Sequence, residues 1–307
     1  LRPRPRPRSE PDAAGGLMAR PPLDGTVLVT GASSGIGAEF ARQLAGEATA
    51  LVLVARRRDR LLQLRDELVA RHPRLRVAVY DRDLGQVDQV HELLATLARD
   101  GLTVDVLIND AGMGDLGLFE TSSWDKLHEM LRINVVGFTA LLLPLYAGMV
   151  ARGRGGVLNV SSGFGLVFFP AYATYVGTKF YVTGLTESLR AEAGGTGVVV
   201  SQLCPGPVST EFDARAGNRL GVPIPSFVAI PADQCVRDAI RGFRRGRATI
   251  VPGWLLWFWI HVGAATPRWV LRPLFGLLGR IARRQAARAA VDQERSGMLP
   301  PGAFPRS

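Results

Sequence analysis

The chain has 307 residues, of which 47% are apolar and 21% charged, as is typical of a globular protein and not of a disordered one. This length allows one large domain or two small ones. Cys204 and Cys235 are the only cysteines, which argues against a disulfide scaffold and against a cysteine-based metal site and is typical of a reducing, cytoplasmic environment; we expect no metal.

The net charge of +10 belongs to the two ends of the chain. Residues 241–307 carry +10 and residues 1–17 carry +2, whereas residues 18–240 carry −2. The body therefore gives no reason to expect nucleic acid as a partner. Residues 1–20 begin with alternating arginine and proline and lack an apolar run, so we expect a disordered tail without a secretory signal and Met18 as a natural start.

From Thr26 onwards, short apolar stretches alternate with longer amphipathic ones. Seven stretches that are apolar almost throughout predict buried strands at 26–30, 50–55, 75–80, 104–109, 156–161, 197–203 and 248–251. The segments between them have helical spacing of apolar residues. Strand alternating with helix predicts an α/β fold with a doubly wound, seven-stranded parallel sheet, as a single domain over 21–253 with a C-terminal extension at 254–307.

The first predicted strand leads into TGASSGIG (30–37), which is followed by an amphipathic helix. Gly31 permits a tight turn, Gly35 lets the backbone approach a pyrophosphate, and Gly37 lets the helix pack close to the sheet. The helix N-terminus then directs N–H groups and its positive dipole end at the phosphates. Because of its place between strand and helix, the motif predicts a dinucleotide site; the alternative is an ordinary strand-to-helix turn.

The end of the second strand, ALVLVARRRDRL, bears on the choice of cofactor. Ala55 stands where an acid would bind a free ribose 2′-hydroxyl, and Arg56 follows as an arginine that binds a 2′-phosphate would. The pattern favours NADP(H) over NAD(H). Alternatively, residues 56–58 are only a solvated helix start.

Lysine is rare in this chain: of 37 basic residues only Lys126 and Lys179 are not arginine. Lys179 follows Tyr175 by four residues in a stretch that is predicted to be helical, so the two side chains share a face. A nearby ammonium favours the phenolate, and lowering a tyrosine pKa by ~3 units corresponds to about 4 kcal/mol. The spacing predicts Tyr175 as a general acid that Lys179 assists, in preference to Tyr172 or Tyr181.

Two further polar residues lie where a site is expected. Ser162 follows the fifth strand, at the carboxyl edge of the sheet. Asn134 lies within a predicted helix, in LRINVVG, where its side chain competes with the backbone. Taken singly, Ser162 could be a helix cap and Asn134 a satisfied core amide.

These motifs, in this order, resemble the short-chain dehydrogenase/reductase family, which has a Rossmann-like fold. The likeness covers about residues 24–252 and rests on TGASSGIG (30–37), Asp83-Leu84, NDAG (109–112), INVVG (133–137), Ser162, the segment from Tyr175 to Lys179, and CPGPVST (204–210). A narrower likeness is to bacterial reductases of long acyl chains, including the ketomycolate type.

The resemblance implies a catalytic tetrad of Asn134, Ser162, Tyr175 and Lys179. It also implies that Asp83 contacts the adenine, Asn109 the adenosine side, and residues 205–210 the nicotinamide. The full set of implied cofactor residues is Gly31, Ser33, Ser34, Gly35, Ile36, Gly37, Arg56, Asp83, Leu84, Asn109, Ala111, Gly112, Tyr175, Lys179, Pro205, Gly206, Val208 and Thr210. Asp110 replaces the usual second asparagine, which we expect to alter a strand-to-loop hydrogen bond.

The expected activity is NADP(H)-dependent interconversion of a ketone and a secondary alcohol, by a homodimer or homotetramer. The alternatives are a cofactor-binding sensor or scaffold, and an enzyme of the same family that catalyses epimerisation or dehydration. Aromatic residues beside the expected site favour a bulky apolar substrate, such as a ketoacyl chain or a sterol-like molecule, although they could instead pack in a core or dimer interface: Phe164, Phe168, Phe169 and Tyr172. Residues 211–230 are expected to form a lid.

The C-terminal extension is both apolar and basic. Residues 254–266 are too few to span a bilayer, which needs about twenty. A helix is predicted from Pro273, with an apolar side at Leu274, Phe275, Leu278, Ile281 and Ala282 and an opposite side at Arg280, Arg283, Arg284 and Arg288. This pattern predicts peripheral contact of 254–290 with the inner face of a membrane. Alternatively, the extension covers the substrate pocket or a neighbouring subunit.

Overall fold

The computed structural model describes residues 20–209, 211–212, 216–217 and 229–295. Seven strands form one parallel sheet in the order β3-β2-β1-β4-β5-β6-β7, which confirms the predicted doubly wound, Rossmann-like α/β fold. The strands are β1 (Thr26–Thr30), β2 (Ala50–Ala55), β3 (Arg76–Asp81), β4 (Val106–Asn109), β5 (Gly155–Val160), β6 (Val198–Leu203) and β7 (Thr249–Ile250).

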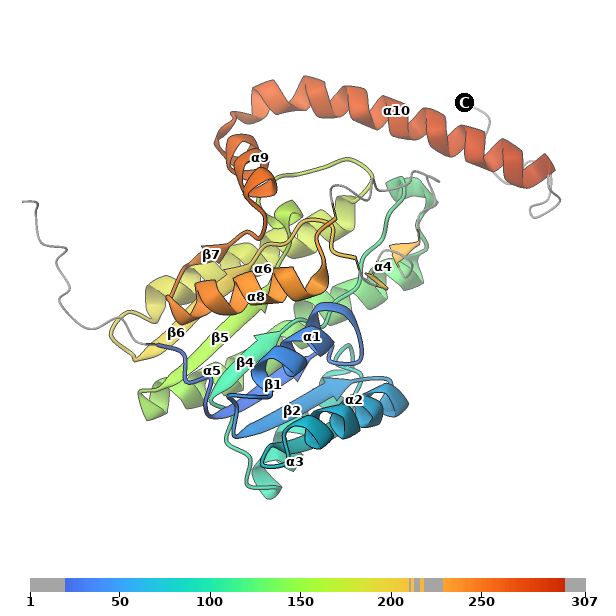
Figure 1. Cartoon of the computed structure of the whole chain (residues 1–307). Helices are drawn as coiled ribbons and strands as arrows, with labels where there is room; N and C mark the ends of the chain where they lie inside the picture. The colour runs from blue at the N-terminus through green and yellow to red at the C-terminus, as the bar shows by residue number, and fades with distance from the viewer. Residues whose placement is uncertain (1–19, 210, 213–215, 218–228, 296–307) are drawn as a thin grey trace, which may run out of the picture.

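Two layers of helices cover the sheet (Figure 1). One face carries α1 (Gly35–Leu44), α2 (Arg58–Arg71) and α8 (Ala232–Arg244), and the other carries α3 (Val87–Arg99), α5 (Phe138–Arg152) and α6 (Ala173–Glu192). In β1, Val27 and Val29 pack in the hydrophobic core on the α1, α2 and α8 face, and Leu28 packs in the core on the opposite face. All three are 0% exposed. A strand that is buried on both faces must be apolar throughout, which is why the sequence reveals these strands.

The strand order reverses between β1 and β4, which pair with Val27 opposite Val106. Connections leave these two strands in opposite directions, so a crevice opens at their carboxyl ends. The glycine turn after β1, the loop after β4 and the turn after β5 all meet at this edge, and the fold therefore brings the predicted motifs together.

The segment between β4 and β5 contains η1 (Phe119–Thr121), α4 (Trp124–Leu131) and a π-helical turn, η2 (Arg132–Gly137), before α5. A Cβ on Gly137 would overlap the carbonyl oxygen of Leu84, so the helix approaches the loop after β3 closely. Among the described residues, Trp124–Arg152 is the helical stretch whose length and composition alone would suffice to cross a membrane. Core helices pass the same test, and α5 packs against the sheet through Phe138, Leu141 and Leu142.

The extension forms two helices outside these layers, α9 (Trp254–Ala265) and α10 (Arg268–Arg295), with α10 running over the top of the molecule in Figure 1. The prediction that this last helix begins at Pro273 is wrong. The carbonyl oxygen of Pro267 accepts a hydrogen bond from the Val270 N–H at 2.9 Å and closes the first turn. Leu271 is already buried, and its packing offsets the N–H that Pro273 lacks inside the helix.

Candidate active site

The glycine turn is built by backbone shape and close approach. Gly31 has φ of 68°, a conformation that favours glycine. A Cβ on Gly37 would lie 2.7 Å from the Gly31 carbonyl oxygen, so the first turn of α1 rests directly on the loop. The N–H groups at the start of α1 therefore face the crevice, where an anionic group would be stabilised.

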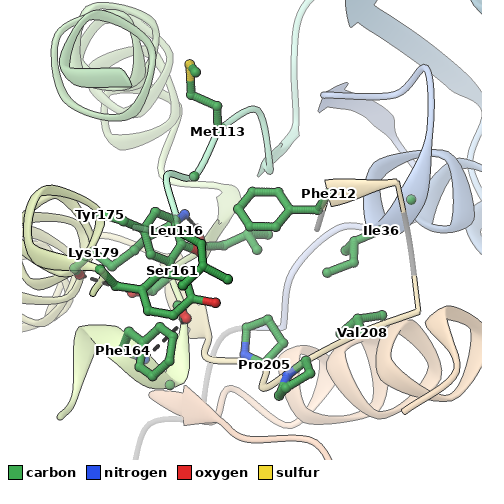
Figure 2. A pocket seen from close by; sticks show the side chains of 18 of the residues that line it. Ile36, Met113, Leu116, Ser161, Phe164, Tyr175, Lys179, Pro205, Val208 and Phe212 are labelled. Carbon is green, nitrogen blue, oxygen red and sulfur yellow. Dashed lines mark hydrogen bonds between the residues drawn. The ribbon is translucent and has the colours of Figure 1, made fainter. Parts of the chain in front are cut away.

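A cavity of about 1100 Å³ starts at this turn and continues past the ends of β4, β5 and β6. It is lined by most of the residues that the resemblance implies: Gly31, Ser33, Ser34, Gly35, Ile36, Arg56, Asp83, Leu84, Ala111, Gly112, Ser162, Tyr175, Lys179, Pro205, Gly206 and Val208. Figure 2 shows Tyr175, Lys179 and Phe164 on one side of this cavity and Ile36 and Val208 on the other. Thr210 lies outside the described residues.

Asn109 and Asn134 do not line the cavity, and both are almost fully buried. Asn109 accepts a hydrogen bond from the Thr30 hydroxyl at 3.3 Å and donates one to the Phe138 carbonyl oxygen at 3.4 Å. The structure therefore does not bring Asn109 to the expected adenosine contact. As the last residue of β4, it joins β1 to α5.

Asn134 lies in the π-helical turn, which explains why a mid-helix asparagine is tolerated there. Its Oδ1 accepts from the Met113 N–H at 2.9 Å, and its Nδ2 donates to the Met113 carbonyl oxygen at 2.8 Å and to the Thr178 hydroxyl at 3.1 Å. Asn134 thus fixes the loop after β4 against α6, the helix that carries Tyr175 and Lys179.

The predicted catalytic side chains lie together at the carboxyl end of β5. Lys179 is 6% exposed, donates to the Val160 carbonyl oxygen at 2.8 Å, and has its Nζ 5.7 Å from the centre of the Tyr175 ring. Ser162 accepts a hydrogen bond from the Phe164 N–H at 3.2 Å, so its own hydroxyl hydrogen can still be donated into the cavity. Burial lowers the pKa of Lys179 to about 8, an effect that the Asp110 carboxylate opposes.

The side chain of Asp110 does not alter the strand-to-loop hydrogen bond as we expected. Its backbone N–H makes the strand-to-loop bond, to the Thr30 hydroxyl at 2.9 Å, whereas its carboxyl lies under the glycine turn. A Cβ on Gly31 or Gly37 would be 2.9 Å from Oδ2, and the Gly37 N–H donates to the carboxyl. Burial raises the pKa of Asp110 to about 7, opposed by the Lys179 charge and by the Gly37 hydrogen bond.

Replacing Asp110 with asparagine should stabilise the protein in a pH-dependent way. Because the folded-state pKa lies above the ordinary 3.8, the carboxyl costs no folding free energy below about pH 4, an increasing amount between about pH 4 and pH 7, and its full amount above about pH 7. Asp110→Asn should therefore raise Tm more at about pH 8 than at about pH 5. The gains in the free energy of unfolding at the two pH values should differ by a quantity on the order of 2 kcal/mol. Thermal melts at both pH values measure this, with the exposed Asp24→Asn as control. An equal shift at both pH values would contradict it.

Two arginines at the end of β2 reach the cavity, and the sequence drew attention only to the first. Arg56 pairs with Glu129 at 2.7 Å. Arg57 donates to the hydroxyl and the carbonyl oxygen of Ser33, at 3.1 and 3.2 Å, so it supplies the cation that the glycine loop lacks. The Glu211 carboxylate pairs with Arg57 and Arg60, which lower its pKa to about 2. An anionic group is therefore already accommodated beside the turn.

The second lysine also has a specific place, which sequence reasoning missed although its rarity was a signal. Lys126 Nζ pairs with the buried Asp115 at 2.9 Å and donates to the Ala216 carbonyl oxygen at 2.6 Å. It ties the loop after β4 to the segment that begins at 211, of which only 211–212, 216–217 and 229–230 are described. The lid predicted at 211–230 lies mostly outside the described residues.

The far end of the cavity is apolar and is closed by the extension. Phe164, Phe169 and Tyr172 line it, whereas Phe168 packs against Phe275 of α10 with ring centres 4.9 Å apart. A Cβ on Gly163, in the turn η3 (Gly163–Gly165), would lie 2.7 Å from Ile260 of α9. Six residues of the extension line the cavity: Trp259, Ile260, Leu278, Ile281, Ala282 and Gln285. The alternative prediction, that the extension covers the substrate pocket, is therefore correct for the sides of α9 and α10 that face the cavity.

The sheet order, the glycine turn at the strand reversal and the serine, tyrosine and lysine around one crevice define a dinucleotide-dependent oxidoreductase of the doubly wound class. The family model described as short chain dehydrogenase matches residues 25–220, and the chain belongs to this family. Members bind nicotinamide cofactors and act on small molecules.

Relatives cover most of the chain. A very-long-chain 3-oxoacyl-CoA reductase of Mycosarcoma maydis is 32% identical over 265 residues, which is 85% of this chain and 75% of that protein. The structure of a short-chain dehydrogenase from Sphingobium yanoikuyae in complex with NADPH aligns with a TM-score of 0.69 and 27% identity over 92% of this chain and 100% of that one. A bulky-bulky ketone specific alcohol dehydrogenase from Comamonas testosteroni aligns with a TM-score of 0.65 and 25% identity, covering 92% and 96% of the two chains.

Proposed function

We propose that this protein interconverts a bulky, apolar ketone and its secondary alcohol with NADP(H) as cofactor. The observation that carries the proposal is one continuous cavity that joins the glycine turn to the hydroxyls of Ser162 and Tyr175 and ends among apolar side chains. The names of the Mycosarcoma and Comamonas relatives, a reductase of very long 3-oxoacyl chains and a dehydrogenase of bulky ketones, agree with this choice of substrate.

The residues at the turn fit a nicotinamide dinucleotide phosphate. The closely packed start of α1 suits a pyrophosphate, and Arg56 and Arg57 flank the position where the second strand ends without an acid, at Ala55. The ion pair between Arg57 and the Glu211 carboxylate supports the proposal, because it places an anion beside this arginine. When bound, the cofactor would supply or accept the hydride.

The protein's own groups would handle the substrate oxygen and the proton. In reduction, Ser162 donates a hydrogen bond to the carbonyl oxygen, and Tyr175 donates its proton to the same atom. Lys179, held by the Val160 carbonyl oxygen, places its charge beside the Tyr175 ring and favours the phenolate that remains. Asn134 acts through structure, because it locks α6 to the loop that forms the opposite wall.

The activity is tested by following the absorbance of NADPH with ketones of increasing apolar bulk. Each methylene buried in the apolar end should add up to about 0.8 kcal/mol, or about fourfold in kcat/KM. A preference for small polar ketones would contradict the substrate class. Absence of NADPH consumption with every ketone would favour a sensor, a scaffold, or epimerase or dehydratase chemistry instead.

Assembly as a homodimer or homotetramer is part of the proposal. It is supported by exposed apolar side chains on the helical layer that α5 and α6 form, among them Leu143 and Tyr181.

A further inference from the structure

One side of α10 packs against the domain that contains the cavity. Buried or half-buried residues recur along it with helical spacing: Leu271, Phe275, Leu278, Gly279, Ala282, Gln285 and Ala286. This stripe packs on the aromatic loop after β5 and on Leu116 and Leu118. The apolar side that the sequence predicted for a membrane is thus largely used to cover the cavity.

A second apolar surface remains on the extension. Of the sixteen large hydrophobic side chains that are exposed among the described residues, nine lie within residues 257–281. On α10, Val270, Leu274, Leu277 and Ile281 recur at i, i+4, i+7 and i+11, and Trp269 is 74% exposed. Among the described side chains of α9, the large apolar ones that are exposed are Trp257, Phe258, Trp259 and Val262. Exposed apolar side chains concentrated to this degree mark a surface that binds something.

The charges around this surface have one sign. From the start of α9 at Trp254 up to Asp292 the sequence has no acidic residue and has six arginines. Arg283 pairs with Glu120 of the body at 2.6 Å. Within the described part of the chain, no acidic side chain lies within ion-pair distance of Arg268, Arg272, Arg280 or Arg284. At about 100° per residue, Arg280 and Arg284 lie opposite the buried stripe and beside the exposed apolar one.

We propose that this surface, formed by the exposed side chains of α9 and α10 named above together with Arg280 and Arg284, docks on an anionic lipid bilayer. Tryptophans and aliphatic side chains flanked by arginines suit the boundary between acyl chains and anionic headgroups. A second copy of the chain is a poorer occupant, because it would bring a surface of the same positive charge. Nucleic acid would leave the exposed leucines and valines in water.

The docking surface meets the cavity. Trp259 and Ile281 both line the cavity and remain 63% and 40% exposed, so the helices that cover the apolar end of the cavity also carry the docking surface. We infer that an apolar ketone enters the cavity between α9 and α10, directly from the lipid. This access route rests on the proposed function, whereas the docking surface does not.

Cosedimentation of the full chain with vesicles tests the docking. We expect binding to vesicles of phosphatidylcholine mixed with phosphatidylglycerol, weaker binding as salt is raised, and little binding to phosphatidylcholine alone. Replacing Arg280 and Arg284 together by glutamine should lower the partition coefficient about 25-fold, since each arginine near such a surface contributes about fivefold.

A matched control removes the same charge elsewhere: Arg99 and Arg154 replaced by glutamine. These exposed residues lie at or beside the loops that lead into β4 and β5, at the opposite edge of the sheet, and their loss should leave binding nearly unchanged. Leu277→Ser on α10 should weaken binding, whereas Val69→Ser, an exposed apolar residue on α2, should not.

Three results would overturn the proposal: no sedimentation of the full chain with anionic vesicles at low salt, an equal loss in the control, or a change of mass in solution in the variant that lacks Arg280 and Arg284, which would mean that the surface joins two copies. None of the substituted residues lines the cavity, so reduction of a water-soluble ketone should be unchanged. If no ketone is reduced but anionic vesicles still bind, the proposed function fails and the docking surface stands.

Discussion

Replacing Tyr175 by phenylalanine should abolish ketone reduction and leave NADPH binding intact. Phenylalanine keeps the ring that lies edge-on to Phe164, with centres 6.5 Å apart, and next to Phe212 at 5.7 Å, so the wall of the cavity should be preserved. Only the hydroxyl is lost, and a positioned general acid contributes about 10²–10⁴ in rate. The fall should appear in kcat, measured by NADPH consumption, with the Kd for NADPH unchanged by fluorescence titration.

The same substitution on the same helix provides the control. Tyr181 lies outside the cavity, and its hydroxyl bonds to Thr139 at 2.8 Å, so Tyr181→Phe should keep full activity. Tyr172 is the more demanding comparison, because it lines the cavity with its ring centre 6.1 Å from that of Tyr175. Full turnover by Tyr175→Phe, with loss in Tyr172→Phe, would mean that the roles of the two tyrosines are reversed.

Arg57→Ala should weaken the binding of NADPH by about 10–100-fold and that of NADH by less than about threefold, since hydrogen bonds to a charged group contribute about 1.5–3 kcal/mol. Arg57 is already anchored at the glycine turn through Ser33, so little of its entropy remains to be lost when a phosphate binds. Arg56→Ala should act in the same direction, since Arg56 also lines the cavity and pairs with Glu129 as Arg57 pairs with Glu211. Titration of both cofactors against both variants measures the two ratios.

Arg58→Ala is the neighbouring control. Arg58 pairs with Asp81 at 2.9 Å, is well exposed and does not line the cavity, so its loss should leave both affinities nearly unchanged. If Arg57→Ala weakened NADPH and NADH equally, the group that contacts the 2′-phosphate would lie elsewhere, and NADP(H) would no longer be favoured over NAD(H).

Local pattern was enough to predict the strands and most of the cavity. The strands are apolar throughout because both faces of the sheet are covered, and parallel strands place their carboxyl ends at one edge, so the motifs after β1, β4 and β5 had to meet. Tyr175 and Lys179 could be predicted to share one face of a helix because residues four apart lie about one helical turn apart. This relation needs no tertiary information. The bias towards arginine made the lysine conspicuous.

The tertiary structure decided the interactions between segments far apart in the chain. Arg57 and not only Arg56 contacts the turn, because the chain direction at the end of β2 selects which side chain reaches Ser33. Asn109 is buried between β1 and α5, and Asp110 lies near Lys179, since the packing of β4 fixes where each side chain points. None of these contacts has a signature in sequence spacing.

In the C-terminal extension, the properties that the sequence determines and those that the tertiary structure determines are clearly separate. Its composition and helical period are local properties, so the sequence by itself determined an apolar and basic helix after the last strand. Which part of the apolar surface packs on the body and which part remains exposed depends on Phe168, Gly163 and Leu116, which lie about 100 to 170 residues away along the chain. Burial depends on what approaches a side chain in space, and only the folded structure sets those partners.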